Sequence, residues 1–142
     1  YHDQTLTMHA PEVHREQAPN LSWAGYPVVM VQSGGVDMRF GLDTGARITV
    51  LDTSFLELLP DPNAENVQSR QGGAGGYEDV DAVRVRDVRL EVGGLGVGFA
   101  KLDALDSHDS ALIEVQGIIG SDAGAGRTMI LDYPCGHFAL AQ

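Results

Sequence analysis

The sequence is poor in cysteine, in basic residues and in long apolar runs. Its single cysteine, Cys135, excludes a disulfide within the chain. Nine Lys and Arg residues stand against twenty Asp and Glu, and the formal net charge of −11 would repel the phosphates of nucleic acids and of anionic membranes. No apolar run reaches the roughly 18 residues that a membrane-spanning helix requires. These absences argue against a nucleic-acid-binding protein and against a chain that spans a membrane.

Glycine and apolar residues are what the sequence has instead. Hydrophobic residues make up 43% of the 142 positions, which is enough for the core of one ordinary domain. The 18 glycines follow no three-residue period and are accompanied by only 6 prolines, so the chain is not collagen-like. Glycines grouped between short apolar runs are typical of a β-rich protein with tight turns.

The first 25 residues are polar and have no apolar periodicity. We expect a tail or linker there, followed by one folded domain over residues 26–142. The three histidines of this tail have spacings that match no closed zinc site, and in a dimer the tail could add a strand to the partner. The chain begins with Tyr1, so removal of a leader or anchor stays open, which would favour an extracytoplasmic location; the compartment is otherwise undecided.

Beyond the tail, short apolar and β-branched runs alternate with turn signals. They predict about eight short strands among the apolar segments 27–31, 36–42, 48–51, 83–92, 97–105, 112–115, 117–120, 128–131 and 137–140. The glycine-rich stretch 71–76 has polar flanks and predicts the tip of a hairpin.

Two further signals interrupt the strand pattern. Ser54 and Glu57 have the spacing of a capping box and predict a short helix that ends before Pro60. A slip of the apolar period at Arg86 and Asp87 predicts a β-bulge. The expected fold is therefore all-β, a small closed β-barrel with one or two short helices.

The chemistry centres on the tripeptide Asp43-Thr44-Gly45, which lies between two apolar runs. An acidic residue between two buried strands is unfavourable unless its surroundings stabilise it. Thr44 supplies a hydroxyl, and Gly45 lets the backbone approach the carboxylate closely. We therefore take Asp43 as the first candidate for a catalytic residue.

Two more motifs follow in order, the glycine-rich tip and the string Gly117-Ile118-Ile119-Gly120. The order of the motifs resembles that of the retropepsins, above all the single-domain bacterial members. In these proteins an Asp-Thr-Gly-Ala string is followed by a flap and then by two hydrophobic residues and a glycine. The resemblance extends over residues 26–140, and includes the strand and turn at 88–95 and the Asp-Tyr pair at 132–133.

The resemblance implies an aspartic endopeptidase without a metal or an organic cofactor, active as a homodimer on peptide or protein substrates. Asp43, Thr44 and Gly45 would be its catalytic residues, with Thr44 bracing its mate in the other subunit. The flap would consist of Gly72, Gly73, Ala74, Gly75 and Gly76, and substrate contacts would also come from Ala46, Arg47, Ile118, Ile119 and Gly120.

The resemblance implies a partner subunit because the chain lacks a second Asp-Thr-Gly string. Ser54 and His108 stand where Asp52 and Asp106 would need a glycine, so we interpret both aspartates as loop or cap residues. A single-chain enzyme with two lobes would also need about twice this length. The second carboxylate is therefore expected from Asp43 of another copy, across a two-fold axis.

Some residues depart from the pattern and keep two alternatives open. Viral members commonly have an acidic residue at the position of Arg47, and they follow the last motif with a bulky apolar helix, whereas segment 121–126 here is small and glycine-rich. One alternative is a retropepsin-like domain that binds peptides without cutting them. The other rests on the string from Asp43 to Arg47 alone, which also resembles retropepsin-like proteins described as zinc-dependent.

Overall fold

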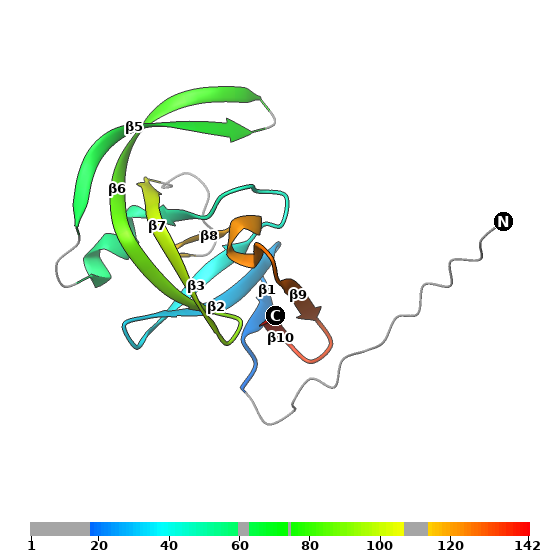
Figure 1. Ribbon diagram of the computed structural model, residues 1–142. Coiled ribbons are helices and arrows are strands. Elements are labelled where there is room, and N and C mark those ends of the chain that lie inside the picture. Colours follow the sequence, from blue (N-terminus) through cyan, green and yellow to red (C-terminus); the bar gives the residue numbers. More distant parts are fainter. Residues whose placement is uncertain (1–17, 60–62, 74, 107–113) are drawn as a thin grey trace.

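The computed structural model describes residues 18–59, 63–73, 75–106 and 114–142 (Figure 1). Within them the chain forms mainly β-strands and two short 3₁₀ helices. The strands are β1 Leu21–Trp23, β2 Pro27–Ser33, β3 Val36–Leu42, β4 Val50–Asp52, β5 Ala64–Gly73, β6 Gly76–Val92, β7 Leu95–Leu105, β8 Gly117–Ile119, β9 Thr128–Asp132 and β10 His137–Ala141, and the helices are η1 Thr53–Leu58 and η2 Ser121–Gly124. The all-β class that the sequence predicts is confirmed.

Eight strands form one sheet in the order β1-β2-β3-β8-β4-β7-β6-β5, and β9 and β10 form a separate hairpin. Neighbouring strands are antiparallel except for the pairs β3–β8 and β4–β7, which are parallel. An additional pairing joins β2 to β6, with Val31 opposite Val92. Because these two strands stand near opposite ends of the order, the sheet curls back on itself.

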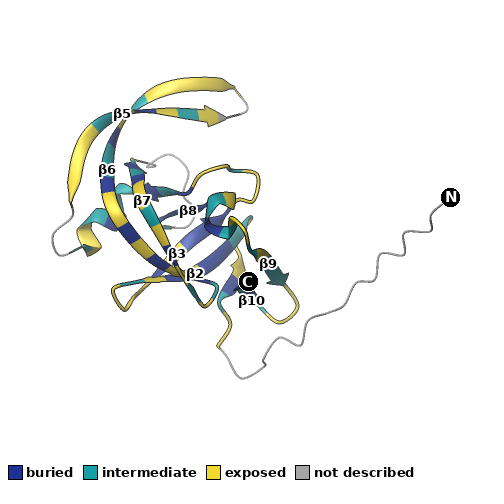
Figure 2. Cartoon of the chain, in the orientation of Figure 1, coloured by how far each residue is buried: buried dark blue, intermediate teal, exposed yellow. Residues whose placement is uncertain are grey.

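The core consists of buried side chains from successive strands of this curled sheet. Figure 2 shows the buried stretches of these strands in dark blue. Phe40 of β3 and Phe55 of η1 are fully buried and pack edge to face, with ring centroids 6.2 Å apart. A side chain of this size contributes about 1.5–3 kcal/mol when it is buried. Phe55 therefore fixes η1 against the sheet beside β3, the strand that leads into Asp43.

The predicted β-bulge at Arg86 and Asp87 is absent. Asp87 does have an unusual backbone, with a positive φ of 56°. The pairs on either side, Arg86 with Lys101 and Val88 with Phe99, nevertheless keep one register. At Asp87 the alternation of buried and exposed residues shifts by one position in both strands, so their buried side chains change from one face of the sheet to the other. The apolar period thus slips without an extra residue in either strand.

The folded domain starts earlier than residue 26. Leu21 is buried, and its amide donates to the carbonyl of Gly136 at 2.9 Å. The side chain of Asn20 donates to the carbonyl of Phe138 at 2.8 Å and accepts from the amide of Phe138 at 2.7 Å. Residues 18–25 are therefore anchored to the β9–β10 hairpin and are not a tail, while residues 1–17 lie outside the described residues.

The short helix before Pro60 is present, but its cap differs from the prediction. Asp52 is the N-cap, and its carboxylate accepts from the amide of Ser54 at 2.8 Å. The expectation that Asp52 is a cap residue is thus confirmed, whereas the capping box led by Ser54 is wrong. An aspartate at this position satisfies an otherwise unpaired amide of the first turn.

Two predicted strands also differ in extent. The strand expected at 48–51 is observed as β4, Val50–Asp52. It starts two residues later than predicted, because residue 49 takes part in a side-chain network described below. Of the strand expected at 112–115, residues 112 and 113 lie outside the described residues, and residues 114 and 115 have no regular structure.

Candidate active site

Asp43 stands directly after β3, at the point where β3 runs parallel to β8. Leu42 is opposite Ile119 in that pair, and the amide of Asp43 donates to the carbonyl of Ile119 at 3.0 Å. The backbone that carries the carboxylate is therefore a continuation of the sheet. The two hydrophobic residues of the Gly-Ile-Ile-Gly string lie beside it, as the order of the sequence motifs predicts.

The Asp43 carboxylate is held by the turn that follows it. Its Oδ1 accepts from the amide of Gly45 at 2.9 Å and from the amide of Ala46 at 3.2 Å. A Cβ at position 45 would lie 3.2 Å from the same oxygen, so glycine leaves room for this contact. The described residues offer no hydrogen bond to Oδ2. The carboxylate is exposed in the single chain, with one oxygen fixed and the other available to a reactant.

A buried hydrogen-bond network holds the far end of this loop. Thr49 is 2% exposed, and its amide donates to both carboxylate oxygens of Asp122, at 2.9 and 3.0 Å. The Thr49 hydroxyl donates to Asp122 Oδ1 at 2.7 Å and accepts from the amide of Gly120 at 3.0 Å. The amide and the hydroxyl of Thr49 thus both have partners in or next to η2.

The middle of the loop is attached to the same segment. The carbonyl of Ala46 accepts from the amide of Ser121 at 2.8 Å and from its hydroxyl at 2.9 Å. A Cβ at position 120 would lie 2.5 Å from the carbonyl carbon of Ile48, so only glycine fits there. The small residues after Ile119 therefore allow η2 to lie directly against the loop of Asp43.

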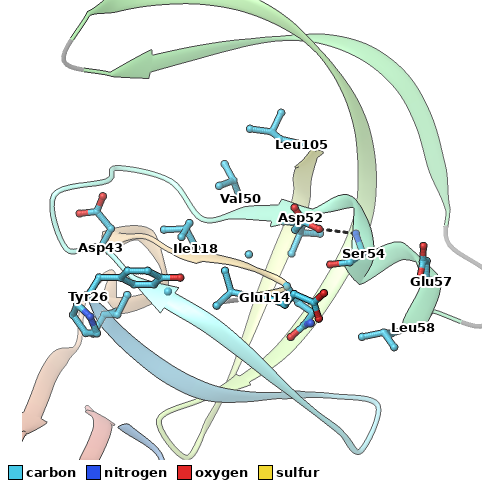
Figure 3. A pocket seen from close by; sticks show the side chains of 17 residues that line it. Tyr26, Asp43, Val50, Asp52, Ser54, Glu57, Leu58, Leu105, Glu114 and Ile118 are labelled. Atoms are coloured by element: carbon cyan, nitrogen blue, oxygen red, sulfur yellow. Dashed lines mark hydrogen bonds between the residues drawn. The ribbon is translucent and has the colours of Figure 1, made fainter. Parts of the chain in front are cut away.

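A groove of about 930 Å³ extends from Asp43 along β4 (Figure 3). Apolar side chains line it near Asp43, among them Tyr26, Val50 and Ile118. At the other end it is lined by Glu57, Leu58 and Glu114, and Figure 3 shows these three residues on the side remote from Asp43. The groove is large enough to hold several residues of an extended peptide.

A two-stranded arm, residues 67–82, projects from the sheet above this side of the molecule (Figures 1 and 3). It consists of the end of β5 and the beginning of β6, and Gly73 opposite Gly76 closes its tip. On the other side of β6, the pairing with β7 starts only at Val83. The arm is thus a hairpin that extends beyond the body of the sheet.

The predicted site residues fall into three groups. Asp43, Thr44, Gly45 and Arg47 are exposed on the loop, and Ala46 is half-buried among them. Ile118 lines the groove, but Ile119 and Gly120 are buried behind the loop and support it instead of lining the groove. The glycines Gly72, Gly73, Gly75 and Gly76 lie at the arm's tip, and Ala74 lies outside the described residues.

A family model described as aspartyl protease matches residues 29–123, which is more than half of the chain and includes the loop, the arm and β8. The chain belongs to this family. Its structure is also similar to that of the EIAV protease complexed with the inhibitor HBY-793, with a TM-score of 0.52 and 25% identity, over 75% of this chain and 93% of that chain. No curated protein sequence matches the chain.

The resemblance to retropepsins is therefore confirmed: this is a retropepsin-like member of the aspartyl protease family. In the described part of the chain, no three His, Cys, Asp or Glu side chains gather into a potential metal site. The same residues include no helix that is long and apolar enough to span a membrane.

Sequence reasoning missed the residues that position the aspartyl protease loop. Thr49 and Asp122 are 73 positions apart in the sequence. Segment 121–126 has a low helix propensity, and this gave no indication that Asp122 accepts hydrogen bonds from the loop. A carboxylate two residues after the apolar Gly-Ile-Ile-Gly string was the available signal, because a carboxylate close to buried segments requires donors nearby. Tyr26 and Leu105 in the groove gave no signal, since only the curled sheet brings them there.

Proposed function

We propose that two copies of this chain form an aspartic endopeptidase in which each copy supplies one Asp43 carboxylate. The observation that carries the proposal is the carboxylate itself, fixed through Oδ1 by two backbone amides and exposed at the end of a groove. The family and the fold support peptide hydrolysis as the type of reaction.

Two copies are needed because Asp52, the other aspartate of the groove, does not supply a second carboxylate beside Asp43. Asp52 lines the groove but caps η1 through Ser54, and Figure 3 shows Val50 and Ile118 between it and Asp43. The loop that carries Asp43 is exposed, and Ile48 beside it is a large apolar side chain with 51% of its surface exposed. In this proposal the exposed loop faces the other copy, so that the two Asp43 carboxylates meet across a two-fold axis.

The chemistry follows from the pairing of two carboxylates. Two such groups a few ångströms apart cannot both be ionised, so the pair holds one proton. The ionised Asp43 takes a proton from a water molecule, whose oxygen attacks the peptide carbonyl, while the protonated Asp43 of the other copy donates a hydrogen bond to the carbonyl oxygen. Collapse of the tetrahedral intermediate then breaks the C–N bond, and the Asp43 carboxyl that took the proton from water gives it to the leaving nitrogen.

In this proposal the arm acts as the flap and the groove receives the substrate. The glycines at the tip allow the backbone of the arm to approach a bound peptide, and closure would exclude water from the carboxylates. The described groove lining contains Asp43, Asp52, Glu57 and Glu114 but neither Lys nor Arg. We therefore expect peptides with apolar residues near the cleaved bond to be preferred, and acidic peptides to be poor substrates.

The dependence of activity on association tests the two-copy mechanism. Sedimentation equilibrium gives the fraction of dimer at each concentration, and cleavage of a peptide is measured in parallel. Specific activity per chain should rise in proportion to the dimer fraction. Constant specific activity over a range in which the dimer dissociates would contradict the mechanism, and binding of peptides without cleavage at any concentration would indicate a non-cutting peptide-binding domain.

A further inference from the structure

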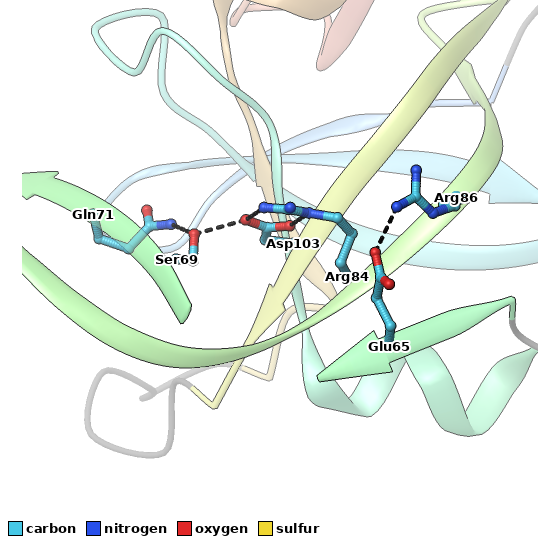
Figure 4. Close-up of polar contacts among 6 residues, drawn as sticks. All are labelled: Glu65, Ser69, Gln71, Arg84, Arg86 and Asp103. Atoms are coloured by element: carbon cyan, nitrogen blue, oxygen red, sulfur yellow. Dashed lines mark hydrogen bonds and ion pairs between the residues drawn. The ribbon is translucent and has the colours of Figure 1, made fainter. Parts of the chain in front are cut away.

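A chain of side-chain hydrogen bonds joins the arm to the body of the sheet (Figure 4). Gln71 donates to the hydroxyl of Ser69 at 2.8 Å, and Ser69 donates to Oδ2 of Asp103 at 2.6 Å. Arg84 holds the same carboxylate with two hydrogen bonds, from Nε to Oδ1 at 2.7 Å and from Nη2 to Oδ2 at 3.0 Å. Ser69 and Gln71 belong to the arm, whereas Asp103 belongs to β7.

The bond between Ser69 and Asp103 is possible only in a strongly bent sheet. Ser69 pairs with Val80 on β6, but Asp103 pairs with Arg84, four residues further along the same strand. In a flat sheet these offsets, about 13 Å along the strands and about 10 Å across two strand spacings, would separate the two residues by about 16 Å. That is beyond the reach of two short side chains. The hydrogen bond therefore forms when the arm curls toward β7 and is lost when the arm straightens.

Few side chains in the described part of the arm are buried. Most are exposed, including Tyr77 at 75%, and the buried ones are Ser69 at 5% and, at the base of the arm, Ala82 at 7%. The cation–π contact of Arg70 with Tyr77 and the hydrogen bond of Gln68 with Asp81 lie within the arm itself. A two-stranded hairpin is marginally stable on its own, so its orientation depends on contacts with the body.

We propose that Asp103 is a positioning residue that holds the arm, through Ser69, in the bent orientation above the loop of Asp43. The two anchors differ in mobility. Arg84 stands opposite Asp103 in the β6–β7 ladder and fixes the carboxylate in the body, whereas Ser69 can leave it with the arm. The contact is thus a latch between a fixed acceptor and a movable donor.

The electrostatics of the cluster agree with this arrangement. The hydrogen bond from Arg84 is the main reason that the pKa of Asp103 lies below its usual range, and the bond from Ser69 lowers this pKa further, although burial acts in the opposite direction. An ionised carboxylate is a stronger acceptor than a neutral one, and hydrogen bonds to it are short. The distance of 2.6 Å between the Ser69 hydroxyl and Asp103 Oδ2 has this character.

For the proposed protease, a latch of this kind affects substrate binding more than chemistry. When the arm already has its bent orientation, less conformational freedom is lost as it closes over a peptide. Loss of the latch lowers the fraction of molecules that are ready to bind, which raises KM and leaves kcat nearly unchanged. This part of the inference depends on the proposed function, whereas the orientation of the arm does not.

The test measures the orientation of the arm directly. Spin labels are placed on the arm at Glu78→Cys and on β3 at Asp37→Cys, with Cys135→Ser to remove the native thiol, and labelled chains are diluted with unlabelled ones. Double electron–electron resonance then gives the distribution of distances within one chain. Ser69→Ala removes the hydroxyl that donates to Asp103 and accepts from Gln71. Ser22→Ala is the matched control, since its hydroxyl donates to the carbonyl of Val28 on the distant β1–β2 pair.

The parent should show one narrow distance, and Ser69→Ala should add a second population that makes up about four-fifths of the molecules, whereas Ser22→Ala should match the parent. Asp103→Ala should give the same second population, and the double variant no more of it, because both changes break one contact. An unchanged distribution in Ser69→Ala would overturn the latch.

Kinetics separate the latch from the proposed function. Ser69→Ala should raise KM about fivefold, the factor expected when about a fifth of the molecules keep the bent arm, with kcat within twofold of the parent. A shifted distance distribution with an unchanged KM would overturn the positioning role while the latch itself stands. If the parent cleaves no peptide at all, the proposed function fails, and the distance measurement still decides the latch.

Discussion

The loop of Asp43 and the arm above it are held in opposite ways. Residues 43–49 are fixed by backbone and buried side-chain bonds to β8 and η2, segments more than 70 positions away in the sequence. Residues 67–82 pair mainly with each other and contact the body through a hydroxyl on a carboxylate. The loop has many partners in rigid elements, whereas the arm has a hydrogen bond to the body that rotation of one side-chain bond can break.

The contrast agrees with what peptide hydrolysis asks of each region. A reacting carboxylate must keep its position within a fraction of an ångström, which rigid backbone contacts provide. A segment that admits a substrate must open and close, so it is drawn from the weakly held parts of a fold. Substitutions that affect only one region should therefore have different effects. In the loop they should lower the free energy of unfolding, and in the arm they should change its orientation.

The largest effect on stability is expected from Gly120→Ala. The new Cβ would lie 2.5 Å from the backbone carbon of Ile48, and backbone atoms on both sides must shift to relieve the overlap. We expect a loss of about 3 kcal/mol in the free energy of unfolding, measured by urea titration. Gly96→Ala is the control, because a Cβ there meets nothing within 4 Å, and it should change stability by less than about 1 kcal/mol.

A smaller loss is expected from Asp122→Ala. The substitution leaves the amide and hydroxyl of the buried Thr49 without their acceptor, and each unsatisfied buried group costs about 1–3 kcal/mol. Urea titration should show a loss of about 2 kcal/mol. Asp37→Ala, which removes an exposed hydrogen bond with Gln32, should stay within about 0.5 kcal/mol of the parent. Equal losses in the two variants would mean that the network does not brace the loop.

The smallest effect concerns the pH dependence of the arm. The pKa of Asp103 is lowered in the folded chain, so the contribution of its hydrogen bonds is fully present above the ordinary carboxyl range and is lost as the pH falls through the lowered value. The distance between labels on the arm and on β3 should therefore be constant from about pH 5 to pH 8, and the second population should grow below about pH 4.

Two other charged groups act on this cluster. Lys101 contributes to the lowered pKa of Asp103, and Glu65 acts on the Arg84 guanidinium. Asp103→Asn removes the titrating group and keeps these neighbours, so its distance distribution should not change with pH. A response of the same size in Asp103→Asn would assign the effect to another residue.

Much of the fold could be predicted because its signals are local. The apolar runs and glycine turns of β2, β3, β6 and β7 each span a few residues. The Asp-Thr-Gly string is equally short and indicates the loop of Asp43 by itself. The position of β1 was missed because Leu21 becomes buried only against the β9–β10 hairpin. The bulge at Asp87 was predicted wrongly since the sequence of one strand does not reveal that its partner changes face at the same level.

The supporting residues could not be predicted for the same reason. Thr49 with Asp122, and Ser69 with Asp103, are polar pairs from distant segments that meet only when the sheet curls. Each residue alone is compatible with an exposed position. Sequence patterns thus indicate Asp43 as the candidate carboxylate, whereas the contacts that hold the loop and the arm are visible only in the structure.

The most direct test of the central claim is to incubate the chain and its Asp43→Asn variant with a complex peptide mixture from about pH 3 to pH 8, and to identify new termini by mass spectrometry. The variant should keep its fold, because an asparagine oxygen can still accept from the amides of Gly45 and Ala46. The account predicts cleavage by the parent, next to apolar residues, and none by the variant. Cleavage by the variant at the parental rate would contradict it.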